Sequence, residues 1–105
     1  LEAELPTLDV LYMTRIQQER FFNEEDYLRL KGCYSLNAKL LEQAPADMPV
    51  LHPLPRIDEI KLDVDNDPRA AYFDQVHNGV YIRMAIILAL LGIPDPLTGK
   101  SVLYA

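Results

Sequence analysis

A run of charged and amide side chains, Thr14-Arg15-Ile16-Gln17-Gln18-Glu19-Arg20, follows a short apolar segment near the start of the chain. The planar guanidinium of Arg15 can hold a carboxylate or a phosphate through two parallel hydrogen bonds. Gln17 can donate to and accept from the same ligand, and Glu19 is near enough to pair with Arg15 and orient it. These residue types predict a site for a small anion. The alternative is a solvated loop of mixed charge, which periodicity alone favours.

A second constellation, His52-Pro53-Leu54-Pro55-Arg56, carries prolines at alternate positions. Proline locks φ and has no backbone N–H, so the carbonyls beside the prolines can be left free to accept hydrogen bonds. A stiff loop that presents carbonyls suits an amide or amine ligand. We expect Arg56 to form a local ion network with Asp58 and Glu59. The alternative interpretation, which is stronger for these residues alone, is a rigid strand terminator.

Other reactive residue types favour structural roles. His52 has neither a second histidine nor a nucleophile beside it, which predicts a structural, hydrogen-bonded histidine. The acids Asp63, Asp65 and Asp67 alternate as in a calcium loop, but the required glycine and terminal glutamate are missing, so we expect a solvated acidic turn. Cys33 lacks a nearby cationic partner and is predicted to be a small buried residue.

Composition excludes several classes of protein. The 105 residues carry a formal net charge of −6, which argues against non-specific binding to nucleic acid or to an anionic membrane. One cysteine and two histidines cannot form a Cys₄ or Cys₂His₂ zinc site, and no cofactor is indicated. A single cysteine is typical of a reducing compartment, so we expect a cytoplasmic protein. The longest apolar run, Met84–Leu91, is far below the roughly 20 residues that span a bilayer.

The elements that must position these residues begin with two strands and the helices between them. The apolar segment 8–14 predicts a buried strand, and 48–52 predicts a second strand. Between them, Asn23 can cap a short helix that Gly32 ends, and Ser35 can cap another whose apolar face comprises Leu36, Leu40 and Leu41. Two strands joined by such a crossover should be parallel.

A long helix is predicted after an acidic, irregular connection over 58–67. Asp67-Pro68 has the composition of a helix start, and Gly92 that of a helix end. We expect one continuous helix in which Gly79 allows close packing, the alternative being a break into two helices at Asn78-Gly79. The apolar stretch 84–91 should be buried. The residues after 92 read as a loop. The fold class is α/β, part of a doubly wound parallel sheet with two parallel strands, crossover helices and a long C-terminal helix, in an incomplete domain.

Three linked motifs go beyond these generic patterns. The segment that contains Arg15 resembles the aspartate-loop segment of aspartate carbamoyltransferase catalytic chains, and the segment around Pro53 resembles that family's second signature. The long helix resembles the family's C-terminal helix. The resemblance covers nearly the whole chain, in the family's order, through residues 9–20, 50–60, 63–65, 69–73 and 78–85.

The sister family, ornithine carbamoyltransferase, has Cys where this chain has Pro53, and a Ser-Met-Gly motif where this chain has Arg15 and its neighbours. The resemblance is therefore to the aspartate enzyme. Charge agrees with this choice, because Arg15 suits an extra carboxylate whereas the ornithine side chain carries a cation.

The resemblance implies an enzyme that transfers the carbamoyl group of carbamoyl phosphate to the amine of L-aspartate in pyrimidine synthesis. It implies that Arg15 and Gln17 bind aspartate, that Glu19 orients Arg15, and that the backbone of Pro53, Leu54 and Pro55 binds the carbamoyl group and the incoming amine. It also implies a homotrimer of catalytic chains with shared sites, in which a regulatory chain or a dihydroorotase can take part.

The same resemblance makes residues 1–105 the C-terminal portion of the aspartate-binding domain. The family's Ser-Thr-Arg-Thr-Arg phosphate motif and its catalytic histidine belong to a carbamoyl phosphate domain that these residues do not include, so this segment contains no catalytic residue. We expect the segment by itself to be inactive. The alternative from another class is a binding or interaction module that kept half of the fold and lost catalysis.

Overall fold

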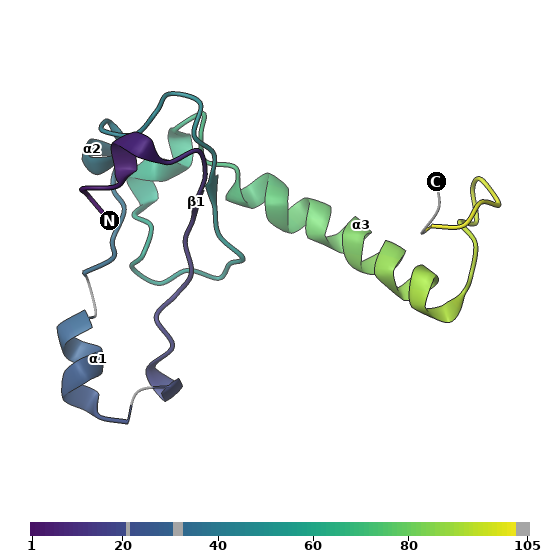
Figure 1. Cartoon of the computed structure of the whole chain (residues 1–105), viewed down its shortest axis with the longest axis horizontal. Coiled ribbons are helices and arrows are strands. Elements are labelled where there is room, and N and C mark those ends of the chain that lie inside the picture. Colours follow the sequence, from purple (N-terminus) through teal and green to yellow (C-terminus); the bar gives the residue numbers. More distant parts are fainter. Residues whose placement is uncertain (21, 31–32, 103–105) are drawn as a thin grey trace. The chain divides into compact units, whose positions relative to one another are not determined.

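The computed structural model describes residues 1–20, 22–30 and 33–102. The chain divides into two compact units, Leu1–Phe73 and Asp74–Ala105 (Figure 1). The first unit contains both strands and both short helices. The second unit contains most of the long helix and the segment that follows it.

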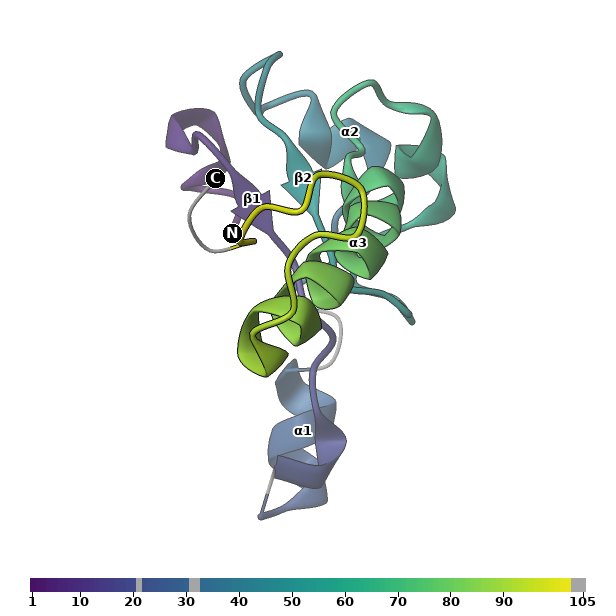
Figure 2. The same cartoon turned by 90° about the vertical axis from the view of Figure 1, so that its right-hand side faces the viewer.

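The two predicted strands are present and parallel, but they are shorter than the sequence suggests. β1 (Leu11–Tyr12) pairs with β2 (Val50–Leu51), with Leu11 opposite Val50 and Tyr12 opposite Leu51 (Figure 2). On the other side of β2, Val50 forms a parallel bridge to Ala70 that the sequence did not reveal. Because β1 and β2 are parallel, the loops that follow them leave the same edge of the sheet.

The first crossover helix, α1 (Glu24–Leu30), begins where the sequence predicts. The Asn23 side-chain oxygen accepts hydrogen bonds from the backbone N–H groups of Glu25 at 2.6 Å and Asp26 at 3.4 Å. Such a cap satisfies N–H groups that have no partner within the first turn of a helix. The predicted stop at Gly32 lies outside the described residues.

The second crossover helix corrects two predictions. α2 (Ala38–Leu41) is capped by Asn37, whose side chain accepts from the N–H of Leu40 at 2.8 Å, and not by Ser35. The Ser35 hydroxyl instead donates to the carbonyl of Asp58 at 2.9 Å. Leu36 is not helical, because it forms a parallel bridge with Ile60. These pairings with a distant segment leave fewer residues for the helix.

The core of the first unit lies around the strand pair and is closed by α2 and η3 (Leu62–Asn66), which pack together. Leu11 of β1 and Met13, the residue after β1, face this core, whereas Tyr12 between them is exposed. The alternation is that of a strand with one buried face. The buried apolar side chains are Leu5, Leu11, Met13, Leu36, Leu41, Met48, Val50, Ile60, Val64 and Tyr72.

The long helix begins later than Asp67-Pro68. α3 spans Tyr72–Leu91, and residue 70 belongs to the bridge with β2. The Asp67 carboxylate accepts from the N–H of Arg69 at 2.9 Å, which forms a turn where a helix start was predicted. The backbone of 69–71 is occupied by hydrogen bonds with Val50, and this pairing delays the helix.

Within the second unit, α3 continues through Gly79 as predicted and ends at Gly92, whose φ of 65° is one that glycine adopts without strain. The N–H of Ile93 donates to the carbonyl of Leu88 at 2.9 Å and closes this end. Residues 93–102 form turns and no helix or strand.

The apolar end of α3 is not buried by the described residues, contrary to the sequence-based expectation. Leu90 is 81% exposed and Leu91 67% exposed, and Met84, Ile86 and Ile87 are each more than half exposed. No described helix has the length and apolar character needed to cross a membrane.

Candidate functional site

Arg15 and Gln17 come together just beyond the carboxyl end of β1. They line an open hollow of about 520 Å³ together with Thr14, Ile16 and Arg20. In open parallel sheets this edge is where ligands bind. The guanidinium of Arg20 adds a second positive charge, for which the sequence analysis assigned no role. Arg20 could have been predicted as a site residue, because it is the last residue of the same polar run, 14–20.

Glu19 pairs with Arg15 as predicted. Its Oε1 accepts from Nη2 of Arg15 at 3.2 Å, and the two side chains are 46% and 60% exposed for Arg15 and Glu19, respectively. An ion pair this exposed contributes about 0–1 kcal/mol at most. The pair therefore contributes little to the stability of the fold.

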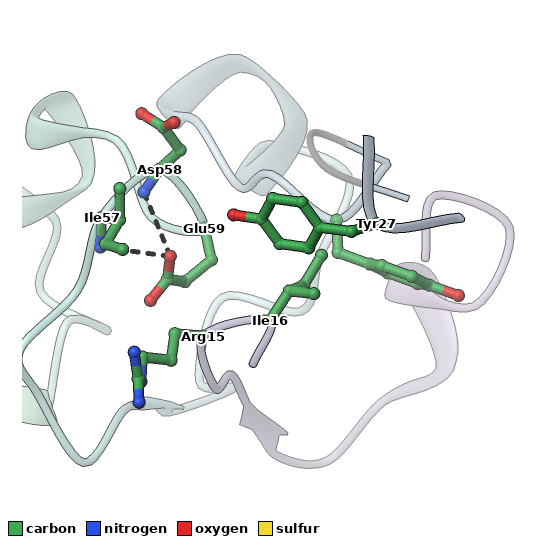
Figure 3. A pocket seen from close by; sticks show the side chains of 7 residues that line it. Arg15, Ile16, Tyr27, Ile57, Asp58 and Glu59 are labelled. Carbon is green, nitrogen blue, oxygen red and sulfur yellow. Dashed lines mark hydrogen bonds between the residues drawn. The ribbon is translucent and has the colours of Figure 1, made fainter. Parts of the chain in front are cut away.

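A second, smaller pocket of about 40 Å³ connects Arg15 to the loop that follows β2 (Figure 3). Ile16 lies beside Arg15 in the segment after β1, Tyr27 and Tyr34 come from α1 and the segment that follows it, and the remaining lining residues come from the loop after β2. Tyr27 of α1 points its hydroxyl into the pocket toward Glu59, whereas the carboxylate of Asp58 points away from Arg15. The lining residues are Arg15, Ile16, Tyr27, Tyr34, Ile57, Asp58 and Glu59.

His52 is buried and hydrogen-bonded, as predicted. It is 1% exposed, and its Nε2 lies 2.7 Å from Oε1 of Glu59, which is 6% exposed. The other oxygen of Glu59 accepts from the N–H groups of Ile57 at 3.2 Å and Asp58 at 3.1 Å. Burial raises the pKa of the Glu59 carboxyl, but hydrogen bonds from its own backbone N–H, from His52 and from the N–H groups of Ile57 and Asp58 outweigh burial, and the pKa lies below its usual value.

The Pro53-Leu54-Pro55 loop leaves the same sheet edge as the Arg15 loop. Leu54 adopts a left-handed backbone conformation with φ of 49°, and the Leu54–Pro55 peptide bond is cis. The N–H of Leu54 donates to Nδ1 of His52 at 2.8 Å. Pro53 and Pro55 are exposed, and Leu54 between them is half-buried.

Arg56 does not form the predicted network with Asp58 and Glu59. Its guanidinium makes two hydrogen bonds to the carboxylate of Asp65, one of them Nη2 to Oδ2 at 2.6 Å, and a third to the hydroxyl of Tyr72 at 3.2 Å. Asp58 pairs with Lys61 instead, at 3.6 Å. The reason is tertiary: η3 brings the carboxylate of Asp65 against the loop.

These contacts shift three pKa values in the directions that the charges demand. Hydrogen bonds from Arg56 lower the pKa of the Asp65 carboxyl, and the same pair raises the pKa of Arg56. Burial, with the hydrogen bond to Asp65, raises the pKa of Tyr72 to about 12. The cluster therefore holds a charged pair beside a neutral phenol at neutral pH.

The predicted solvated acidic turn is wrong for two of its three acids. Asp65 pairs with Arg56, and Asp67 pairs with Arg69 at 2.9 Å. Arg69 also donates to carbonyls at the end of α2 and just beyond it, those of Leu41, Ala44 and Pro45, at 3.1, 3.2 and 3.0 Å. No group of acids, histidines and cysteine among the described residues could hold a metal ion.

Cys33 is exposed, and not buried as predicted. Its Sγ donates to the carbonyl of Arg29 at 3.1 Å, at the end of α1. The thiol therefore interacts with the last turn of this surface helix and does not fill a core position.

Comparison with known proteins assigns the family. A family model described as "Aspartate/ornithine carbamoyltransferase, Asp/Orn binding domain" matches residues 1–90. The chain therefore belongs to this family of amino-acid-binding domains. The family includes aspartate and ornithine carbamoyltransferases, and the relatives described next are named as aspartate carbamoyltransferases.

The aspartate carbamoyltransferase catalytic subunit of Lachnoclostridium phytofermentans is 62% identical over 93 residues, which cover 89% of this chain and 30% of that protein. The Bifidobacterium longum subsp. infantis subunit is 55% identical, covering 97% of this chain and 33% of that protein. A solved structure of Trypanosoma cruzi aspartate transcarbamoylase with N-(phosphonacetyl)-L-aspartic acid has a TM-score of 0.73 and 42% identity, covering 83% of this chain and 27% of that one. The chain thus spans about a third of its curated relatives' length.

Proposed function

We propose that residues 1–105 form the C-terminal portion of the aspartate-binding domain of an aspartate carbamoyltransferase catalytic chain. The observation that carries this proposal is the shared hollow of Arg15, Gln17 and Arg20 at the carboxyl end of β1. The relatives named as aspartate carbamoyltransferase catalytic subunits support the choice of substrate.

L-Aspartate has two carboxylates and one amine, and the hollow offers complementary groups. Arg15 can bind one carboxylate through its planar fork, and Arg20 adds positive charge for the second. Gln17 can donate an amide N–H to the same ligand. The cationic side chain of ornithine would meet two guanidinium groups here, and this repulsion favours aspartate.

The loop after β2 supplies the second half of this proposal. The backbone carbonyls of Pro53, Leu54 and Pro55 accept hydrogen bonds from the carbamoyl N–H groups and the incoming amine. The aspartate ammonium group loses one proton, and the resulting amine attacks the carbamoyl carbon. The bond from that carbon to the phosphate oxygen breaks, and the departing phosphate takes the second proton from the nitrogen. This segment contributes positioning, because reactants held in register react far faster than free ones.

The family resemblance extends the proposal to the complete enzyme. A carbamoyl phosphate domain would bind the phosphate and stabilise the oxyanion that forms at the carbamoyl carbon. The catalytic chains would form a homotrimer, to which a regulatory chain or a dihydroorotase could be added.

The test is a chimeric catalytic subunit, in which residues of this chain replace the aligned segment of the Lachnoclostridium phytofermentans subunit. We expect the chimera to form carbamoyl-aspartate from carbamoyl phosphate and L-aspartate. The parent subunit is the positive control, and L-ornithine is the competing substrate. A folded chimera that carbamoylates ornithine in preference to aspartate, or that carbamoylates neither, would contradict the proposal.

A further inference from the structure

The buried pair of His52 and Glu59 is more than a core filler. Both side chains are almost completely buried, and Nε2 of His52 lies 2.7 Å from Oε1 of Glu59. Removing two polar side chains from water is costly unless their hydrogen bonds are satisfied, and apolar residues would fill the same space at lower cost. Filling the core does not by itself explain this pair, so we looked at what its hydrogen bonds hold in place.

The hydrogen bonds of the histidine define its tautomer. The backbone N–H of Leu54 is a donor, so Nδ1 of His52, 2.8 Å away, must accept. The proton of a neutral imidazole then resides on Nε2 and is donated to the carboxylate of Glu59. The N–H groups of Ile57 and Asp58 donate to the other oxygen of Glu59. The carboxylate that accepts from Nε2 is therefore itself held in place, and it fixes the orientation of the imidazole ring.

One peptide group transmits this orientation to the surface. The peptide bond between Pro53 and Leu54 is not among the cis bonds of the described chain, so its N–H and C=O point in opposite directions within one plane. The N–H of Leu54 points inward to His52. The carbonyl of Pro53 therefore points away from His52, and it cannot rotate without breaking that hydrogen bond.

We propose that His52, held by Glu59, is a positioning residue that aims the Pro53 carbonyl at the nitrogen-bearing groups of the reactants. This inference rests on the proposed function, which assigns that carbonyl to the carbamoyl group and the incoming amine. His52 touches neither reactant and acts through the Leu54 peptide. Its loss should lower kcat more than it raises the KM for aspartate, because the carboxylates bind elsewhere.

Two substitutions in the chimera separate the two ring nitrogens. In His52→Asn the side-chain oxygen can occupy the place of Nδ1 and accept from Leu54. In His52→Gln the amide nitrogen can occupy the place of Nε2 and donate to Glu59, but the acceptor for Leu54 is lost. We expect His52→Gln to lose about 10²-fold in kcat, since a displacement of about 1 Å can cost that much. His52→Asn should retain most of kcat.

Arg69→Met is the matched control, because it removes a partly buried network whose hydrogen bonds go to the carbonyls of Leu41, Ala44 and Pro45 and not to the loop after β2. It should lower the Tm and leave kcat and KM unchanged. If His52→Gln behaves like this control, or if His52→Asn and His52→Gln lose kcat equally, the positioning role is overturned. An inactive unsubstituted chimera would instead overturn the proposed function.

A second pair of variants decides the question if the His52 variants do not fold. Glu59→Gln keeps an oxygen that can accept from Nε2 of His52, whereas Glu59→Leu removes it. We expect Glu59→Leu to lose at least tenfold in kcat and Glu59→Gln to recover most of that loss, measured at a temperature where both are folded. Equal kcat values for the two variants would overturn the proposal.

Discussion

The guanidinium of Arg56 forms two parallel hydrogen bonds with the carboxylate of Asp65, nine residues further along the chain. Tyr72, the first residue of α3, donates its hydroxyl to the same carboxylate. The ring of Tyr72 also lies beneath the guanidinium, whose carbon is 5.4 Å from the ring centre. One carboxylate thus joins the loop after β2 to η3 and to the start of α3.

Acid should weaken this junction. The pKa of Asp65 is lowered by Arg56, so its stabilisation is fully present above the unfolded-state pKa near 3.8 and is lost as the pH falls through the lower folded-state value. Asp65→Asn should lower the free energy of unfolding at neutral pH. It should also flatten the dependence of stability on pH below about 4. Thermal unfolding of the chimera and its Asp65→Asn variant at several pH values measures this difference, and parallel curves would refute it.

Arg15 should control the use of aspartate. Arg15→Ala removes the planar fork from the hollow, so kcat/KM for aspartate should fall by about 10²-fold or more, whereas binding of carbamoyl phosphate stays nearly unchanged. Arg15→Lys should recover little, because a point charge does not replace a fork. Steady-state kinetics of the chimera at saturating carbamoyl phosphate provide the measurement.

Glu19→Gln should have a smaller effect than Arg15→Ala. We expect kcat/KM for aspartate to fall by less than about tenfold, because the Arg15–Glu19 pair is exposed and its expected role is only to orient Arg15. If Arg15→Ala shows normal aspartate kinetics, residues 14–20 are a solvated loop of mixed charge and do not bind aspartate.

The 105 residues by themselves should not form carbamoyl-aspartate at a significant rate. Their sequence contains no Ser-Thr-Arg-Thr-Arg motif, and the resemblance assigns phosphate binding to another domain. A product assay on the purified segment, with a mock purification as the control, tests this expectation. Product above the mock level would refute it.

The purified segment should also self-associate. Apolar side chains of α3 are exposed, among them Ile82, Ile86 and Leu90 at 59%, 51% and 81%. Light scattering should report a mass above 12.0 kDa that rises with concentration. Ile86→Lys, which places a charge on this helix, should lower that mass. A concentration-independent monomer would contradict the expectation.

Gly79 offers a test of what packs on α3. Within the described residues, a Cβ at this position would meet only the guanidinium of Arg83, with the nearest atom at 3.2 Å. The predicted close packing at Gly79 is therefore not made by these residues. Gly79→Ala should stabilise the purified segment by about 1 kcal/mol, because glycine weakens a helix interior. Chemical denaturation measures this change, and a loss of stability would contradict the prediction.

The sequence by itself determined the features that depend on local chemistry. Asn23 caps α1, and Gly92 ends α3, because these residue types satisfy helix ends within a few residues of backbone. The apolar runs identified both strands, and their connection identified the parallel pairing. The linked motifs around Arg15 and Pro53 identified the family.

Tertiary structure alone decided the partners of those polar side chains that pair with other elements of the fold. Arg56 had nearby acids in sequence but pairs with Asp65, because η3 brings that carboxylate to it. Residues 69–71 had the composition of a helix start but pair with Val50. His52 needed a fold that buries it against Glu59. The physical reason is the same in each case: backbone preferences extend over a few residues, whereas a hydrogen bond forms wherever folding brings donor and acceptor together.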